Sequence, residues 1–124
     1  MKNISIALFA ILLLALPAFA LAPVYTLLNA VTATGAGTAQ TLYKPMHMFN
    51  CNLAVGGTAP TDWSVTIEGS IDGTTWGTLA SDASPNYTFQ AIDKPVNYIR
   101  GNYVSKTGGD ATTSFTLKCI GIGY

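Results

Sequence analysis

The sequence predicts one all-β domain, a single antiparallel β-sandwich of the immunoglobulin-like or jelly-roll type with about seven or eight strands. Three observations lead to this class. Beyond Ala30, apolar residues alternate with polar ones, Gly, Pro, Asn and Asp interrupt the alternation at short intervals, and helical periodicity is absent. The chain has 124 residues, which is enough for one domain with a modest core.

Residues 1–20 form a separate segment before this domain. Lys2 gives a positive start, Ile4–Leu16 is apolar apart from one serine, and the segment ends at Ala20 in an Ala-x-Ala pattern. These features are typical of a secretory signal peptide that is cleaved after Ala20. A retained N-terminal hydrophobic anchor is the alternative, because the apolar run continues to about the 20 residues of a membrane helix. The β-sandwich domain then comprises residues 21–124.

The strands are expected as alternating runs bounded by turn residues. They are expected at Asn29–Thr34, Thr41–Tyr43, Met46–Val55, Trp63–Gly69, a return strand that begins with Trp76 and Leu79, then Tyr87–Ala91, Val96–Ser105 and Thr113–Ile122. The alternation assigns these side chains to the core: His47, Phe49, Cys51, Leu53, Val55, Trp63, Val65, Ile67, Phe115, Leu117 and Cys119. It places Met46 and Met48 on the opposite face, and it leaves the faces of Val96–Ser105 ambiguous.

Two glycine-containing segments predict hairpins. Asp72-Gly73, within the stretch EGSIDGTTW, predicts a type I′ turn, in which both central residues have positive φ. Gly108-Gly109 predicts the hairpin that leads into the last strand. We therefore interpret Asp72 and Gly73 as residues of a structural turn.

The two cysteines, Cys51 and Cys119, both fall on predicted inward faces. Because a signal peptide would deliver them to a compartment where disulfides persist, a bridge between them is plausible. The alternative is two buried thiols that serve as small hydrophobic residues. A metal site is not expected, since two cysteines and the single His47 do not supply the four ligands that zinc prefers.

The charge of the chain is balanced, with six basic and six acidic side chains. A protein that binds nucleic acid needs a clustered basic surface, which this sequence lacks. We therefore exclude nucleic acid as a partner. A membrane partner is expected only through residues 1–20, if they are retained.

No group of residues predicts catalysis, and we expect neither an enzyme nor a cofactor. Glu68 and Asp72 could be imagined as the two carboxylates of a glycosidase, but a short solvated turn has little to raise one carboxyl pKa. Glu68, Ser70, Asp72 and Thr74 offer alternating oxygens for calcium, yet they lack the paired acids of an EF-hand loop. His47 is the single imidazole, and the alternation makes it a structural residue.

The aromatic residues offer the remaining candidate binding site. Trp76, Tyr87 and Tyr103 combine an apolar ring with a polar tip, which suits contact with carbohydrate or protein. Packing in the core is the alternative for these rings.

The chain also resembles a known class of proteins. The residues that carry the resemblance are Glu68-Gly69-Ser70, Asp72-Gly73, Trp76, Tyr98-Ile99-Arg100 and Asn102. Their order resembles that of small β-sandwich virion proteins of tailed bacteriophages, which are head-decoration or tail-associated modules. The resemblance implies modules that are often trimeric or displayed in many copies, without enzymatic activity. The signal-like N-terminus is a departure from that pattern.

The residues themselves also predict a contact. Arg100 can form an ion pair with Glu68 across strands, in the bidentate geometry that arginine makes well.

These observations predict a non-catalytic structural or binding module displayed in many copies on a phage virion or cell surface. The expected partners are further copies of the chain, or capsid, tail or filament subunits. One alternative is a secreted adhesin or carbohydrate-binding module that contacts surface glycans. Another is an extracellular filament in which Leu21–Val31 adds as a strand to the sheet of a neighbour.

Overall fold

The computed structural model describes residues 21–83 and 87–123, which form nine strands and no helix. The predicted signal peptide or anchor at residues 1–20 lies outside the described residues. Within the described ranges there is accordingly no helix suited to crossing a membrane. The strands are β1 (Val24–Val31), β2 (Gly35–Ala36), β3 (Gln40–Met46), β4 (Met48–Gly56), β5 (Pro60–Ser70), β6 (Gly77–Ala83), β7 (Thr88–Ala91), β8 (Val96–Gly108) and β9 (Ser114–Ile122).

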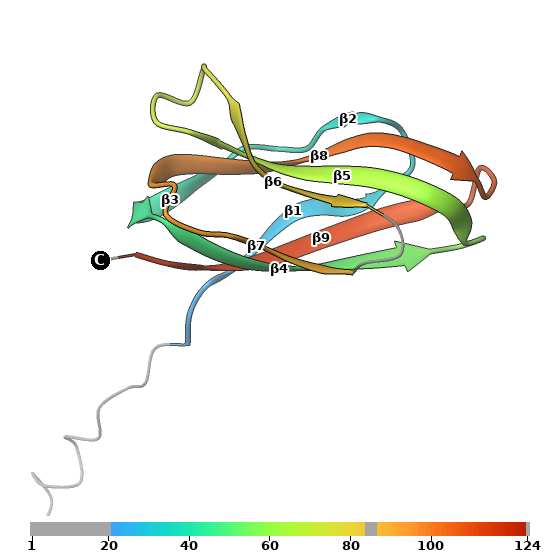
Figure 1. The fold of residues 1–124 in the computed structure, drawn as a ribbon, viewed down its shortest axis with the longest axis horizontal. Helices are drawn as coiled ribbons and strands as arrows, with labels where there is room; N and C mark the ends of the chain where they lie inside the picture. The colour runs from blue at the N-terminus through green and yellow to red at the C-terminus, as the bar shows by residue number, and fades with distance from the viewer. Residues whose placement is uncertain (1–20, 84–86, 124) are drawn as a thin grey trace, which may run out of the picture.

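The strands form two antiparallel sheets that face each other as two layers (Figure 1). The first sheet has the order β1-β9-β4-β7 and the second has the order β2-β8-β5-β6, with β3 also paired to β8. Both β2 and β3 pair with β8, so they act as one interrupted strand. Each sheet then has four strands, and only the β5–β6 connection joins neighbours in one sheet. This arrangement is a jelly roll, so the structure selects the second of the two predicted sandwich types.

The predicted alternation is confirmed in the central strands. Alternate side chains of each strand point between the two sheets, where the facing sheet covers them, so they are almost fully buried. They include Phe49, Cys51, Leu53, Trp63, Val65, Ile67, Phe115, Leu117 and Cys119. The rings of Tyr103 and Phe115 lie 4.6 Å apart and join the two sheets at the centre of this core.

The first strand begins at Val24 rather than at the predicted Asn29. It pairs with β9, and register shifts on both sides of Leu28 interrupt its alternation. As a result the consecutive residues Leu27 and Leu28 are both only 2% exposed. Most of Leu21–Val31, the segment that the filament alternative would donate to a neighbour, is paired with β9 in the chain's own first sheet.

The predicted strand Met46–Val55 is interrupted at His47, which separates β3 from β4. As a result, Met46 and His47 do not have the orientations that the alternation predicted. Met46 ends β3 and is fully buried, whereas it was expected to point outward. His47 is half-buried and belongs to neither strand, so it is not part of the alternating core face of β4. Its backbone N–H donates to the carbonyl of Ile122 at 3.1 Å, and its carbonyl accepts from the N–H of Lys94 at 3.2 Å.

The ambiguity of β8 is also resolved. Ile99, Gly101 and Tyr103 point into the core, and Arg100 and Asn102 point outward. Gly101 is required at its position, because a Cβ there would lie 2.8 Å from the side chain of Leu28. The strand therefore leaves room for β1 on the far side of the core.

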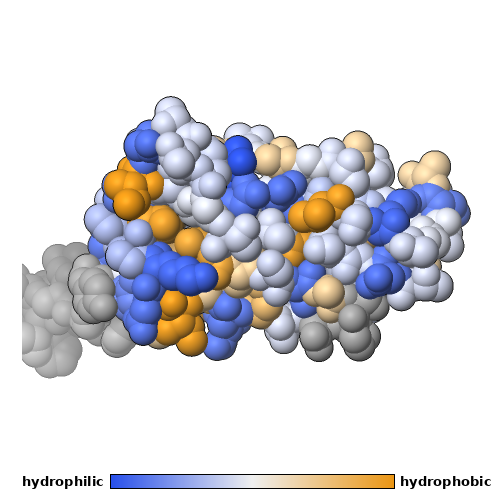
Figure 2. Space-filling model, turned by 45° about the horizontal axis from the view of Figure 1, so that its top comes forward, coloured by the Kyte–Doolittle hydropathy of each residue, from blue (hydrophilic) through white to orange (hydrophobic). Residues whose placement is uncertain are grey.

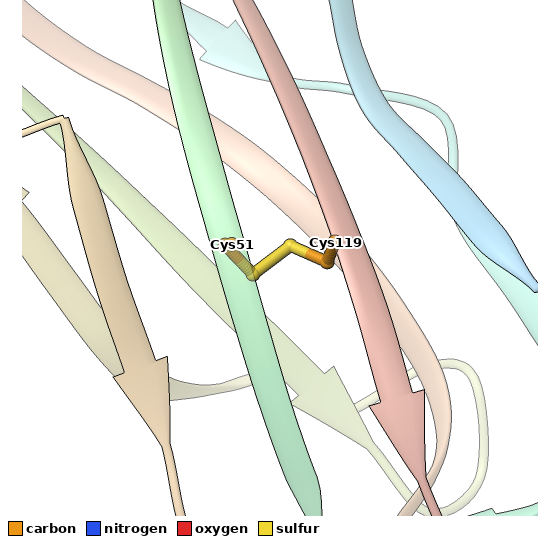
Figure 3. The surroundings of a disulfide bond; sticks show 2 residues. All are labelled: Cys51 and Cys119. Carbon is orange, nitrogen blue, oxygen red and sulfur yellow. A yellow bond between two sulfur atoms is a disulfide. The ribbon is translucent and has the colours of Figure 1, made fainter. Parts of the chain in front are cut away.

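The predicted disulfide between Cys51 and Cys119 is confirmed (Figure 3). The two residues lie directly opposite each other on β4 and β9, with their Cα atoms 4.1 Å apart. The bridge thus links neighbouring strands of the first sheet, and both sulfur-bearing residues are 1% exposed. It joins segments 68 residues apart in the sequence.

Candidate functional site

Four of the residues that carry the sequence resemblance meet on the outer face of the second sheet. Glu68 on β5 lies opposite Arg100 on β8. The Nε of Arg100 donates to Oε2 of Glu68 at 2.6 Å, and Nδ2 of Asn102 donates to Oε1 at 2.9 Å. The predicted ion pair is therefore present, but one carboxylate oxygen is bound by Asn102 instead of by a bidentate arginine. Both oxygens of Glu68 are engaged.

Trp76 completes this outer-face cluster, which comprises Glu68, Trp76, Arg100 and Asn102. The guanidinium carbon of Arg100 lies 4.2 Å from the centre of the Trp76 ring, a cation–π distance. Trp76 is half-buried. Its ring packs against the guanidinium group of Arg100 on the sheet surface.

The loop after β5 is longer than the predicted type I′ turn. It spans residues 71–76, and only Gly73 has a positive φ, of 77°. Oδ1 of Asp72 accepts from the Ser70 hydroxyl at 2.9 Å and from the N–H groups of Thr74 and Thr75 at 2.8 Å each. The two-residue turn is therefore wrong, because the Asp72 carboxylate organises a wider Asx-type loop.

These hydrogen bonds change the chemistry of the loop. The N–H groups of Thr75 and Thr74, followed by the hydroxyl of Ser70, hold the pKa of Asp72 well below its usual range. Such a carboxylate stays ionised and does not exchange a proton near neutral pH. Oδ1 of Asp72 is thereby engaged within the loop itself.

A second loop at the opposite end of the sandwich repeats this arrangement. Oδ1 of Asp110 accepts from the N–H of Thr112 at 2.7 Å, and Oδ2 accepts from the hydroxyl of Thr58 at 2.7 Å. The hydroxyl of the fully buried Thr113 donates to the carbonyl of Thr58 at 2.6 Å. Hydrogen bonds, first from the side chain of Thr112, lower the pKa of Asp110 to about 2. The β8–β9 loop is thereby fixed to residue 58 of the β4–β5 loop.

Gly108-Gly109 predicts a hairpin here, but the loop instead joins β8 and β9 of different sheets. The role of Asp110 in this loop was not predicted, although the sequence contains a signal for it. Asp-Gly-Thr-Thr at residues 72–75 and Asp-Ala-Thr-Thr at residues 110–113 share one pattern. An aspartate followed by threonines favours Asx turns, because the carboxylate accepts from backbone N–H groups two and three residues later. The pattern indicates loop structure at both ends of the fold.

The structure does not bring the three candidate aromatic residues together. Trp76 precedes β6, whereas Tyr87 follows its far end and is 50% exposed. The Tyr87 ring lies 5.2 Å from the ring of Trp63. Tyr103 is 2% exposed and packs on Phe115, so it does not offer a ring to a ligand. The interpretation of Tyr103 as a binding residue is corrected, because β8 turns it into the core.

A hollow of about 510 Å³ lies beside the β5–β6 loop. Leu79 and Val96 line it together with Asp72 and Lys94. The ammonium group of Lys94 donates to the backbone carbonyl of Leu79 at 2.6 Å, so it is already engaged. Figure 2 shows apolar residues gathered towards this end of the molecule, while much of the remaining visible surface is polar or near neutral. No three His, Cys, Asp or Glu side chains in the described ranges are grouped to hold a metal ion.

The described residues thus define a small jelly-roll β-sandwich with a disulfide between neighbouring strands and aspartate-organised loops at both ends. No protein-family model matches the chain, and no curated protein matches it. Among solved structures, the fold is similar to that of YomS, a protein derived from the SPBc2 prophage, with a TM-score of 0.57. The similarity covers 82% of this chain and 92% of YomS at 12% sequence identity, and it is a similarity of fold.

Proposed function

We propose that this protein is a non-catalytic structural module of a phage virion, present in many copies. The observation that carries the proposal is the fold similarity to prophage-derived YomS, which extends over most of both chains. The residues that carry the sequence resemblance also support it, because Glu68, Trp76, Arg100 and Asn102 pack against one another on the outer face of the second sheet.

The state of Glu68, Asp72 and Asp110 supports a structural role for these three residues over a hydrolytic one. Glu68 accepts hydrogen bonds at both carboxylate oxygens, and Asp110 does the same. Asp72 and Asp110 have lowered pKa values, whereas a general acid requires a raised one. These carboxylates therefore serve to hold strands and loops.

The disulfide supports a location outside the reducing cytoplasm. Cys51 and Cys119 form a bridge of the kind that persists in oxidising compartments. Together with the signal-like residues 1–20, this favours assembly at the cell surface or exposure on the released particle.

Mass spectrometry of purified particles tests the proposal. Particles released by the producing cells after induction of phage production are expected to contain the protein in many copies. Its intact mass should correspond to a chain that begins at Leu21 with an oxidised cysteine pair. Absence of the protein from washed, infectious particles would overturn the proposal.

A second candidate function is glycan binding, and it rests on the exposure of Tyr87. This ring is 50% exposed and lies on the Trp63 ring, which fixes its orientation. On a glycan array, Tyr87→Ala should abolish any binding that the wild-type chain shows. Tyr43→Ala is the matched control, because Tyr43 is 68% exposed on β3 of the other sheet. Equal effects of both substitutions would rule out a site at Tyr87.

The filament alternative finds less support. Leu27 and Leu28 fill the chain's own core, so donation of this strand to a neighbour would first require its removal from β9. We therefore favour association through the faces of the folded domain.

A further inference from the structure

We infer that the outer face of the β1-β9-β4-β7 sheet binds the same face of a second copy of this chain. The inference deepens the proposed function and rests on it for the premise of many copies, since it names the surface by which copies meet. It follows from the protection of the sheet edges, from the distribution of charge and from the chemistry of the exposed side chains.

The described strands at the sheet edges are poorly suited to association. The edge strand β1 has two register shifts, and the edge strand β7 has four residues. Pro45 removes a backbone donor from β3. On β6, Asp82 points inward and is 3% exposed, and the ammonium of Lys94 occupies the carbonyl of Leu79. Bulges, proline, short strands and inward charges all oppose the pairing of edges. Contact between copies is therefore expected at a sheet face.

The two sheets differ sharply in charge. Within their described bounds, the four strands of the first sheet contain one charged residue, Lys118. The strands of the second sheet contain the following charged residues: Lys44, Asp62, Glu68, Asp82, Arg100 and Lys106. Depletion of charge distinguishes the centres of protein interfaces from other surface. The first sheet is thus the better candidate.

Exposed aliphatic residues run across this face. Val24 pairs with Ile120, and Ile120 pairs in turn with Asn50, so one row crosses β1, β9 and β4. Ile122 lies two residues further along β9. The exposed fractions are 62% for Val24, 38% for Ile120 and 54% for Ile122, all high for aliphatic side chains. Beside the row lies a hollow of about 390 Å³ that Val24, Ala54, Thr116 and Ile120 help to line. A projecting aliphatic side chain can fill such a hollow.

The chemistry of the face fits a second copy better than a charged partner. The four strands carry no acid to bind a basic surface, and their single lysine gives little attraction for an acidic one. The exposed Asn50 and Asn52 each carry a donor and an acceptor, so amides of two copies can pair with one another. Lys118 can lay its aliphatic stem on the face and extend its ammonium group to the rim. The face is therefore complementary to itself.

The size of the face sets the expected affinity. Four strands at ordinary spacing give a face of roughly 500 Å² in projection. A stable pair usually buries about 800 Å² of accessible surface on each partner. An isolated pair should therefore be weak and concentration-dependent, and display in many copies would strengthen it through multivalency.

Sedimentation velocity over a range of concentrations tests the inference. The oxidised chain from Leu21 onward contains all nine described strands and both cysteines. It should sediment increasingly as a dimer as concentration rises. Ile120→Lys should weaken the association at least tenfold. Val104→Lys should leave it unchanged, because Val104 is 46% exposed on β8 of the other sheet. Thermal melts of each variant establish that the fold is retained.

Crosslinking of the full chain provides a second measurement that does not depend on the truncated form. An amine-reactive crosslinker should join Lys118 of one copy to Lys118 of another, and Ile120→Lys should reduce this product. A wild-type chain that stays monomeric near 1 mM, or an equal effect of both lysine substitutions, would overturn the inference. If the chain stays monomeric but is found in particles, the inference is wrong and the proposed function still stands. If the chain dimerises but is absent from particles, the proposed function is wrong.

Discussion

At the scale of single residues, the outer-face cluster shows how a few side chains of a short motif can hold two strands and a loop together. Arg100 is held by an ion pair to Glu68 and by the ring of Trp76, and Asn102 satisfies the second carboxylate oxygen. The side chains of Arg100 and Glu68 are 26% and 14% exposed, so the pair is only partly screened by water. The cluster joins β5, β8 and the β5–β6 loop.

Loss of Arg100 should therefore destabilise the fold. Arg100→Ala is expected to lower the free energy of unfolding by about 1–2 kcal/mol, because it leaves Glu68 without its cation and uncovers Trp76. Arg100→Lys should recover only part of the loss, since lysine lacks the planar guanidinium group. Urea unfolding measures both changes, with Lys118→Ala as an exposed control. An Arg100→Ala variant as stable as the control would contradict the role of the cluster.

The aspartate of the β8–β9 loop should make stability depend on pH. The pKa of Asp110 is about 2 in the folded chain, below the value of about 3.9 for a free aspartate. Its stabilising contribution is therefore fully present above about pH 4 and is lost as the pH falls towards 2. Urea unfolding at pH 7 and near pH 2 should show a smaller pH effect in Asp110→Asn than in the wild type. Parallel pH profiles would exclude this carboxylate as a source of acid sensitivity.

At the scale of elements, β1 shows how an irregular strand can still be essential. Its register shifts bring two consecutive leucines inward, and Gly101 makes the space that Leu28 occupies. The strand is thus less regularly paired with β9, but it buries two leucine side chains instead of one at this point. The same irregularity makes it a poor template for pairing with another chain.

Truncation of a buried leucine in β1 should be costly. Leu28→Ala is expected to lower the free energy of unfolding by about 3 kcal/mol, through lost burial and the cavity left behind. Leu21→Ala is the matched control, because Leu21 is 92% exposed and should have almost no effect. Chemical denaturation of both variants measures the difference. If both substitutions were neutral, β1 would not be part of the folded core.

At the scale of the whole molecule, the disulfide and the Asp110 loop hold together parts of the chain that are distant in sequence. Cys51 and Cys119 link β4 to the last strand, and the Asp110 loop fixes the β8–β9 connection to Thr58. In a jelly roll most strands are not paired with their neighbours in sequence, so folding must close long loops. Covalent and polar links of this kind offset that cost.

Removal of the bridge should therefore have a large effect. In the chain-entropy account, a loop of this length contributes about 4 kcal/mol by restricting the unfolded chain. A Cys51→Ala, Cys119→Ala double variant should lose stability of that order in urea. The reduced wild type should behave like the double variant. A loss below about 1 kcal/mol would indicate that the bridge mainly fixes local geometry instead of restricting the unfolded state.

The sequence by itself determined the features that depend on local pattern. The alternation through Trp63, Val65 and Ile67, and through Phe115, Leu117 and Cys119, was sufficient to identify two central strands and their buried faces. It also placed both cysteines inward. These predictions succeeded because successive side chains of a strand point to opposite sides, whatever strand lies beside it.

Only the tertiary structure decided the features that depend on which strands meet. The jelly-roll order, the start of β1 at Val24, the burial of Met46 and the inward orientation of Tyr103 all follow from pairings between distant segments. The cluster around Arg100 likewise exists because β5 and β8 are neighbours in the second sheet. Alternation tells which residues share a face, but the choice between two faces is made by the packing of the whole chain.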